Sequence, residues 1–135
     1  MSAMPAFEFI WQVRVYYEDT DAAGVVYYAN YLKFMERART EWLRALGVEQ
    51  TALRDEMGVV FVVRHVTVDY LKPARFNDLL TVLTRIKRLG EARIRFAQTL
   101  QCDGVLATSE VEVVCVNALT FKPVRIPEHI LQLLE

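Results

Sequence analysis

The chain has 135 residues, a length that suits a single domain over residues 1–135 and allows a substantial core to be buried. Hydrophobic residues make up 53% of the chain and charged residues 24%, which indicates a soluble globular protein. The 16 basic and 17 acidic residues give a net charge of −1. The overall charge therefore gives no indication of nucleic-acid binding, and any anionic ligand must be held by a local basic cluster.

The cysteines and the first residues of the chain indicate where in the cell the protein is expected. Cys102 and Cys115 lie in apolar, strand-like segments, without metal-ligand spacing, and two thiols make no disulfide framework. They favour a reduced protein, and we expect a cytoplasmic location. The sequence MSAMPAFEF lacks the basic and apolar regions of a secretory signal. No stretch of about 18 apolar residues occurs, so we expect no membrane span.

Hydrophobic periodicity predicts a strand, an acidic turn and then one long helix. The strand covers residues 7–17, and its alternation places on one face Phe7, Phe9, Trp11, Val13, Val15 and Tyr17. The turn covers residues 18–26, where Gly24 can take a positive φ. From about Tyr28 the apolar spacing becomes that of an amphipathic helix, which Gly47 ends.

The long helix is predicted to bury one apolar stripe against a sheet. The stripe consists of Tyr31, Phe34, Met35, Ala38, Trp42, Ala45 and Leu46. On the polar side, Glu41 is expected to form solvated ion pairs with Arg37 and Arg44.

The rest of the chain reads mainly as strands. A short helix is compatible with residues 51–57, and strands are predicted at residues 59–71, 78–88, 92–102 and 105–119. Pro127 is expected at the first position of a short tail helix. The order predicts an α+β fold in which an antiparallel sheet of about five strands, the later ones forming a meander, wraps one long helix.

The acidic turn before the long helix carries the clearest chemical signal. It holds two carboxylates, Asp19 and Asp21, just before a helix start with free backbone N–H groups and the positive end of the helix dipole. Such a carboxylate can attack a thioester or activate water while the N–H groups hold the oxyanion. It can equally serve only as a helix cap. The residues by themselves leave both interpretations of Asp21 open.

The same stretch, EDTDAAGVVYYANYLKFMERART, resembles the signature of hotdog-fold acyl-CoA thioesterases of the 4-hydroxybenzoyl-CoA thioesterase class. Among these it is most similar to the Tol–Pal-associated acyl-CoA thioesterases of bacteria. The segments DYLKPARFND and FKPVRIPE also resemble this group, and the likeness extends along nearly the whole chain.

The resemblance implies a hotdog fold, with dimers and often tetramers whose active sites lie at the dimer interface. It implies that Asp21 is the catalytic aspartate and that the backbone N–H of Tyr28 polarises the thioester carbonyl. Many Tol–Pal-associated relatives carry His at the position of Tyr28, so a side-chain imidazole role is absent here. The resemblance implies no metal or redox cofactor, because coenzyme A is part of the substrate.

Other residues are candidates for substrate binding. Basic side chains can hold the phosphates of coenzyme A, and the candidates are Arg64, Lys72, Arg75 and Arg88. Lys72 and Arg75 are favoured because Pro73 fixes their corner. Tyr27 and Tyr31, with Tyr28 and Phe34, are candidates for an acyl pocket, although a buried helix start would carry the same residues.

Several alternatives are weaker. Asp19 is expected to accept backbone N–H bonds within the turn rather than to form an Asp-x-Asp metal site with Asp21. Glu36 is the rival catalytic base, but with Lys33 and Arg37 close by, a solvated or interface ion pair is the better interpretation. Neither His65 nor His129 lies in a motif typical of hotdog dehydratases. No Gly-x-Ser-x-Gly elbow is present, which disfavours a serine hydrolase.

Two functional hypotheses follow. The first is hydrolysis of acyl-CoA thioesters by Asp21 with the Tyr28 N–H, the substrate being carried by coenzyme A or by an acyl carrier protein. The second is a non-catalytic hotdog module that binds acyl-CoA, an acyl carrier protein or another protein. Aromatic surface on the first strand and at the helix start also leads us to expect a homo-oligomer, a dimer or a tetramer.

Overall fold

The computed structural model describes residues 8–135. Its strands are β1 (Glu8–Arg14), β2 (Val59–Tyr70), β3 (Leu79–Leu89), β4 (Arg93–Gln101) and β5 (Val105–Asn117). Its helices are α1 (Asn30–Ala45), α2 (Gln50–Ala52) and α3 (Glu128–Leu134), with a 3-10 turn at Tyr17–Asp19 and a π-helical turn at Leu53–Met57. The elements occur in the predicted order, and the α+β class is confirmed.

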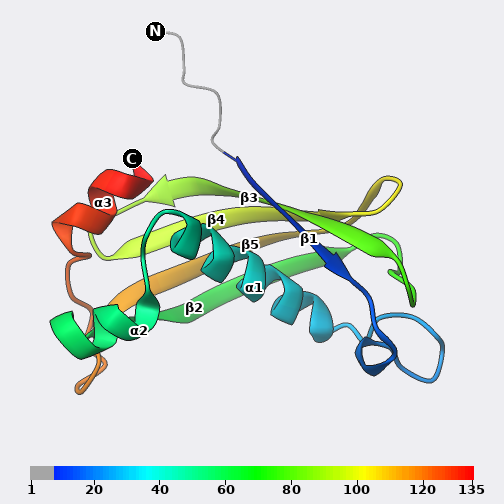
Figure 1. Cartoon of the computed structure of the whole chain (residues 1–135), viewed down its shortest axis with the longest axis horizontal. Helices are drawn as coiled ribbons and strands as arrows, with labels where there is room; N and C mark the ends of the chain where they lie inside the picture. The colour runs from blue at the N-terminus through cyan, green and yellow to red at the C-terminus, as the bar shows by residue number, and fades with distance from the viewer. Residues whose placement is uncertain (1–7) are drawn as a thin grey trace, which may run out of the picture.

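All five strands form one antiparallel sheet in the order β1-β3-β4-β5-β2. The predicted meander is confirmed for β3, β4 and β5, but β2 pairs with β5 at the far edge instead of with β3. The position of α1 explains this arrangement. It connects β1 at one edge to β2 at the other, so it must cross one face of the sheet (Figure 1).

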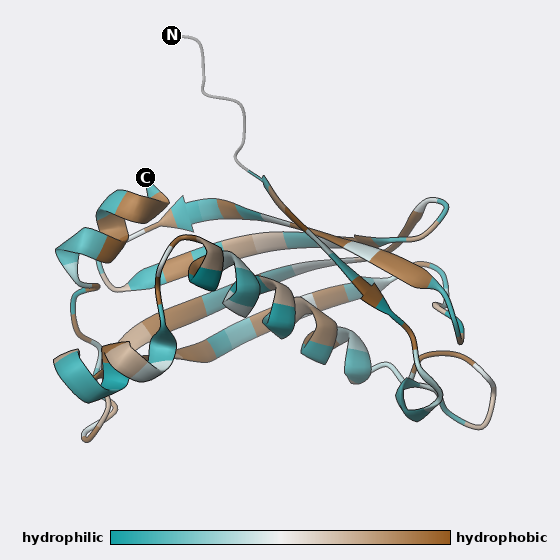
Figure 2. Cartoon of the chain, viewed as in Figure 1, coloured by the Kyte–Doolittle hydropathy of each residue, from teal (hydrophilic) through white to brown (hydrophobic). Residues whose placement is uncertain are grey.

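The helix and the sheet bury their apolar faces against each other, and the alternation of hydrophobic and hydrophilic residues along the strands is visible in Figure 2. One core cluster, around Phe34, Met35 and Leu100, lies under the first half of α1. A second, around Trp42 and Phe96, lies under its second half. Of the predicted stripe, Tyr31, Phe34, Met35, Ala38 and Trp42 are buried, Leu46 is half-buried, and Ala45 is exposed instead.

The ends of the elements differ in detail from the prediction. β1 stops at Arg14 because the chain turns into the 3-10 turn, and Tyr17 is 76% exposed rather than inward-facing. Its ring stacks on Phe76, with ring centroids 3.8 Å apart. Phe7 lies outside the described residues. The predicted end of α1 is confirmed, since Gly47 has φ +92° and the Val48 N–H donates to the Leu43 carbonyl at 2.8 Å.

Candidate active site

The acidic turn is a tight, hydrogen-bonded loop beside the end of β1. The Gly24 N–H donates to the Asp21 carbonyl at 3.0 Å, and Gly24 has φ +81°, a conformation that favours glycine. The Asp21 side chain accepts a 2.9 Å bond at Oδ1 from the Ala23 N–H, so the turn orients this carboxylate. Asp21 itself is exposed to solvent.

Asp19 is structural, as predicted. Its Oδ2 accepts the Tyr16 N–H at 2.8 Å and thereby closes the 3-10 turn. Its carbonyl accepts both the Tyr27 N–H at 3.0 Å and the side-chain amide of Asn30 at 2.9 Å. These bonds tie the acidic turn to the first residue of α1.

The segment before α1 has two backbone donors without a partner among the described residues. α1 begins at Asn30 instead of about Tyr28, because residues 27–30 form a turn in which the Asn30 N–H donates to the Tyr27 carbonyl at 2.8 Å. The N–H groups of Tyr28 and Ala29 make no hydrogen bond to any residue within 8–135. Two adjacent free donors at the positive end of a helix are suited to hold developing negative charge on an oxygen.

The corner between β2 and β3 braces the acidic turn. The Ala74 carbonyl accepts the Val26 N–H at 2.8 Å, and the Ala74 N–H donates to the Tyr31 hydroxyl at 2.9 Å. Val25 and Arg75 form an isolated β-bridge. The fold therefore brings Lys72 and Arg75 to the same end of the sheet as Asp21.

Tyrosine side chains gather at this end. We call Tyr27, Tyr28, Tyr31 and Tyr70 the tyrosine cluster; its neighbouring rings lie between 4.8 and 6.3 Å apart. A hydrogen bond with Tyr28 raises the pKa of Tyr27, and the charge of Asp21 adds a smaller effect in the same direction. Tyr31 is buried, whereas the other three are 45–61% exposed.

The sequence reasoning missed Tyr70. The period-two pattern of β2 offered a signal, because Tyr70 pairs with Ala107 and so shares the helix-facing side of the sheet with Val66 and Val68.

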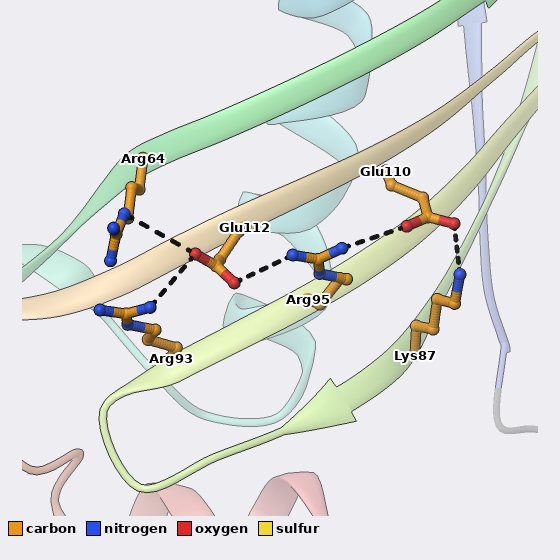
Figure 3. Close-up of polar contacts among 6 residues, drawn as sticks. All are labelled: Arg64, Lys87, Arg93, Arg95, Glu110 and Glu112. Atoms are coloured by element: carbon orange, nitrogen blue, oxygen red, sulfur yellow. Dashed lines mark hydrogen bonds and ion pairs between the residues drawn. The ribbon is translucent and has the colours of Figure 1, made fainter.

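The other two candidates for phosphate binding, Arg64 and Arg88, lie away from Asp21. Arg64 sits at a bulge within β2, 4.0 Å from Glu112 in an ion-pair network on the face of the sheet away from α1 (Figure 3). Arg88 lines a hollow of about 340 Å³ near the β3–β4 turn, together with Arg93 and Arg95. Within one protomer, the four predicted phosphate ligands therefore do not form one patch.

Glu36 and the histidines are also apart from Asp21. Glu36 lies two turns into α1, where its carboxylate accepts the Thr40 hydroxyl at 2.6 Å. Among the described residues of one protomer, Glu36 forms no ion pair with Lys33 or Arg37; pairing across an interface between copies stays a prediction. The predicted pair of Glu41 with Arg44 is confirmed at 2.7 Å, whereas no ion pair joins Glu41 to Arg37 among the described residues. His65 is on β2 and His129 on α3, and both are exposed.

The candidate site is open in the protomer. Four hollows among the described residues are lined by other side chains, and none of the four includes Asp21 or Tyr28. Within residues 8–135, no three His, Cys, Asp or Glu side chains gather as potential metal ligands. No helix in that range is long and apolar enough to span a membrane.

Known thioesterases resemble this chain over most of its length. Residues 15–134 match the thioesterase-like superfamily. The chain is 46% identical over 123 residues to the acyl-CoA thioesterase YbgC of Haemophilus influenzae, covering 90% of each protein. It is 48% identical over 124 residues to the acyl-CoA thioester hydrolase YbgC of Escherichia coli, covering 90% of this chain and 92% of that one.

Solved structures of similar sequence have the same fold. A probable thioesterase from Bartonella henselae superposes with a TM-score of 0.85 at 42% identity, over 90% of this chain and all of the other. The predicted hotdog fold is thereby confirmed.

Proposed function

We propose, since the chain belongs to the thioesterase-like superfamily, that it hydrolyses acyl-CoA thioesters to a free acid and coenzyme A. Asp21 is the catalytic carboxylate and the Tyr28 N–H is the oxyanion donor. One observation carries this assignment of roles: the acidic turn and the free N–H groups of Tyr28 and Ala29 are held together through the carbonyl of Asp19.

The chemistry requires two groups at the thioester. The Tyr28 N–H, pointing at the carbonyl oxygen, stabilises the negative charge that develops there when a nucleophile adds to the carbonyl carbon. In the general-base route, Asp21 takes a proton from water, the water oxygen bonds to carbon, and the C–S bond then breaks. The departing thiolate receives the proton back from Asp21. In the nucleophilic route, an Asp21 oxygen bonds to the carbonyl carbon as the C–S bond breaks and the thiolate of coenzyme A leaves. Water then hydrolyses the resulting anhydride, which releases the free acid, restores the Asp21 carboxylate and supplies the proton that the thiolate takes up.

The surroundings of Asp21 support roles for the substrate-binding candidates. Lys72 and Arg75 lie at the same end of the sheet and carry the positive charge that suits the phosphates of coenzyme A. The ring of Tyr27, 45% exposed, offers apolar surface to an acyl group, whereas Tyr31 is buried in the protomer and supports the cluster through its edge contact with Tyr70. Arg64 and Arg88 can take part only if another copy of the chain brings them near, since both lie away from Asp21 within one protomer.

The decisive experiment measures thiol release from a panel of acyl-CoAs of different chain length and aromaticity, and from matching acyl carrier protein thioesters. Asp21→Asn keeps the side-chain shape, and we expect it to lower kcat/KM by at least about 100-fold. Asp55→Asn is the control, because Asp55 is an exposed carboxylate in the Leu53–Met57 turn.

Equal rates for wild type and Asp21→Asn would remove Asp21 from the mechanism. If wild type released no thiol from any substrate but bound acyl-CoA saturably, the chain would instead be a binding module.

A further inference from the structure

Tyr70 holds the backbone that carries the proposed oxyanion donors. It is the last residue of β2, and its hydroxyl donates a 3.0 Å hydrogen bond to the carbonyl of Tyr28, 42 residues away in the sequence. We infer that Tyr70 is a positioning residue for the reaction, acting through the Tyr28–Ala29 peptide. This inference rests on the proposed function.

The geometry of the peptide group explains how such a bond acts. The Tyr28 carbonyl and the Ala29 N–H belong to the same trans peptide and point in opposite directions. A donor fixed on the carbonyl side therefore fixes the direction of the Ala29 N–H. It also polarises the peptide, which makes that N–H a stronger donor. The Tyr28 N–H is one Cα atom away and moves with the same segment.

Hydrogen bonds to the Asp19 carbonyl hold Tyr27 and Asn30 on either side, but the Tyr28–Ala29 peptide itself has only one other hydrogen bond among the described residues. Its carbonyl also accepts the Tyr31 N–H, but at 3.3 Å, the longest of the backbone bonds around this turn. The Tyr28 side chain is 61% exposed. Oxyanion donors must be preorganised to be effective, because their alignment during the reaction would otherwise cost free energy.

Tyr70 is itself fixed in place. Its ring meets Tyr31 at 5.1 Å and 71°, and Tyr28 at 6.3 Å and 85°, both edge-on arrangements that aromatic pairs favour. Tyr31 is in turn anchored by the Ala74 N–H. Burial raises the pKa of Tyr70, and the neighbouring Tyr31 and Tyr28 raise it further, so its hydroxyl keeps its proton and remains a donor at neutral pH.

Tyr70→Phe tests the hydroxyl alone, since it keeps the ring and both edge contacts. The loss of one such bond is expected to lower kcat by about 3- to 10-fold while KM changes less than about twofold. Tyr17→Phe is the matched control, because its hydroxyl makes no hydrogen bond to a described residue and its side chain is 76% exposed. The melting temperature of both variants should stay close to that of wild type.

A second measurement separates positioning from general destabilisation. In ¹H–¹⁵N spectra, the amide signals of Tyr28 and Ala29 should shift in Tyr70→Phe and stay in place in Tyr17→Phe. Unchanged kcat, unchanged amide signals, or a loss of kcat matched by a loss of stability would each overturn the role of Tyr70. An inactive wild type would instead overturn the proposed function, and the two failures are thus distinguishable.

Discussion

The guanidinium of Arg39 donates a 2.9 Å hydrogen bond from Nη1 to the side-chain oxygen of Gln98, between α1 and β4. The amide nitrogen of Gln98 donates onward at 2.9 Å to both the Met35 carbonyl and the Thr84 hydroxyl. The side chains of Arg39, Gln98 and Thr84 are all buried, and burial lowers the pKa of Arg39. This polar group separates the two apolar clusters of the core and fixes how α1 sits on the sheet.

Gln98→Leu should therefore destabilise the fold. The substitution removes the acceptor of Arg39 and leaves a buried guanidinium without that partner, which we expect to cost about 2–4 kcal/mol in the free energy of unfolding. Urea titration followed by tryptophan fluorescence measures this change. Gln12→Leu, on the exposed face of β1, is the control. If Gln98→Leu lowered the free energy of unfolding no more than the control does, the polar group would be shown to be dispensable.

The ion pairs of Figure 3 predict a pH-dependent contribution to stability. A hydrogen bond from Arg95, with Arg93 and Arg64 nearby, lowers the pKa of Glu112 in the folded state. A lowered pKa means that the stabilisation is present above the unfolded-state pKa and is lost as the pH falls through the folded-state value. Glu112→Gln should thus lower the melting temperature at neutral pH, and the difference from wild type should shrink as the pH falls through the lowered pKa of Glu112.

Salt gives an independent check on the same network, because partly exposed charges are screened. The difference between wild type and Glu112→Gln should shrink in about 0.5 M salt. Glu91→Gln is the control, since Glu91 pairs with Arg125 but its side chain is 83% exposed. A difference that persisted at low pH would assign the effect of Glu112 to packing instead of charge.

Asn30 links the acidic turn to α1, and its removal should affect catalysis. The Asn30→Ala variant loses the bond to the Asp19 carbonyl, so the turn that carries Asp21 is less well fixed against the helix start. We expect kcat to fall by about 3- to 10-fold with a smaller change in KM. Lys33→Ala, on the exposed side of the same helix, should leave kcat unchanged. Equal kcat values for the two variants would contradict the linking role.

We predict that the chain is at least a dimer in solution. β2 lies at the edge of the sheet, and its Val63 and Val66 are 52% and 38% exposed, which suits pairing with a second copy. Light scattering at micromolar concentration should give at least twice the chain mass of 15.6 kDa. Val63→Lys should shift the mass toward the monomer, whereas Thr67→Lys on the opposite face of β2 should do so less. A monomeric wild type would refute the prediction.

The sequence by itself determined the elements, their order, the amphipathic helix and the acidic turn with Asp21. These depend on local periodicity, on turn residues such as Gly24 and Gly47, and on a motif of contiguous residues. Only the tertiary structure decided that β2 pairs with β5, that Tyr70 reaches Tyr28, and that Arg39 meets Gln98. It also separated Arg64 and Arg88 from Lys72 and Arg75. These relationships join residues far apart in the chain, and a single sequence carries no record of which distant segments the packing of α1 across the sheet brings together.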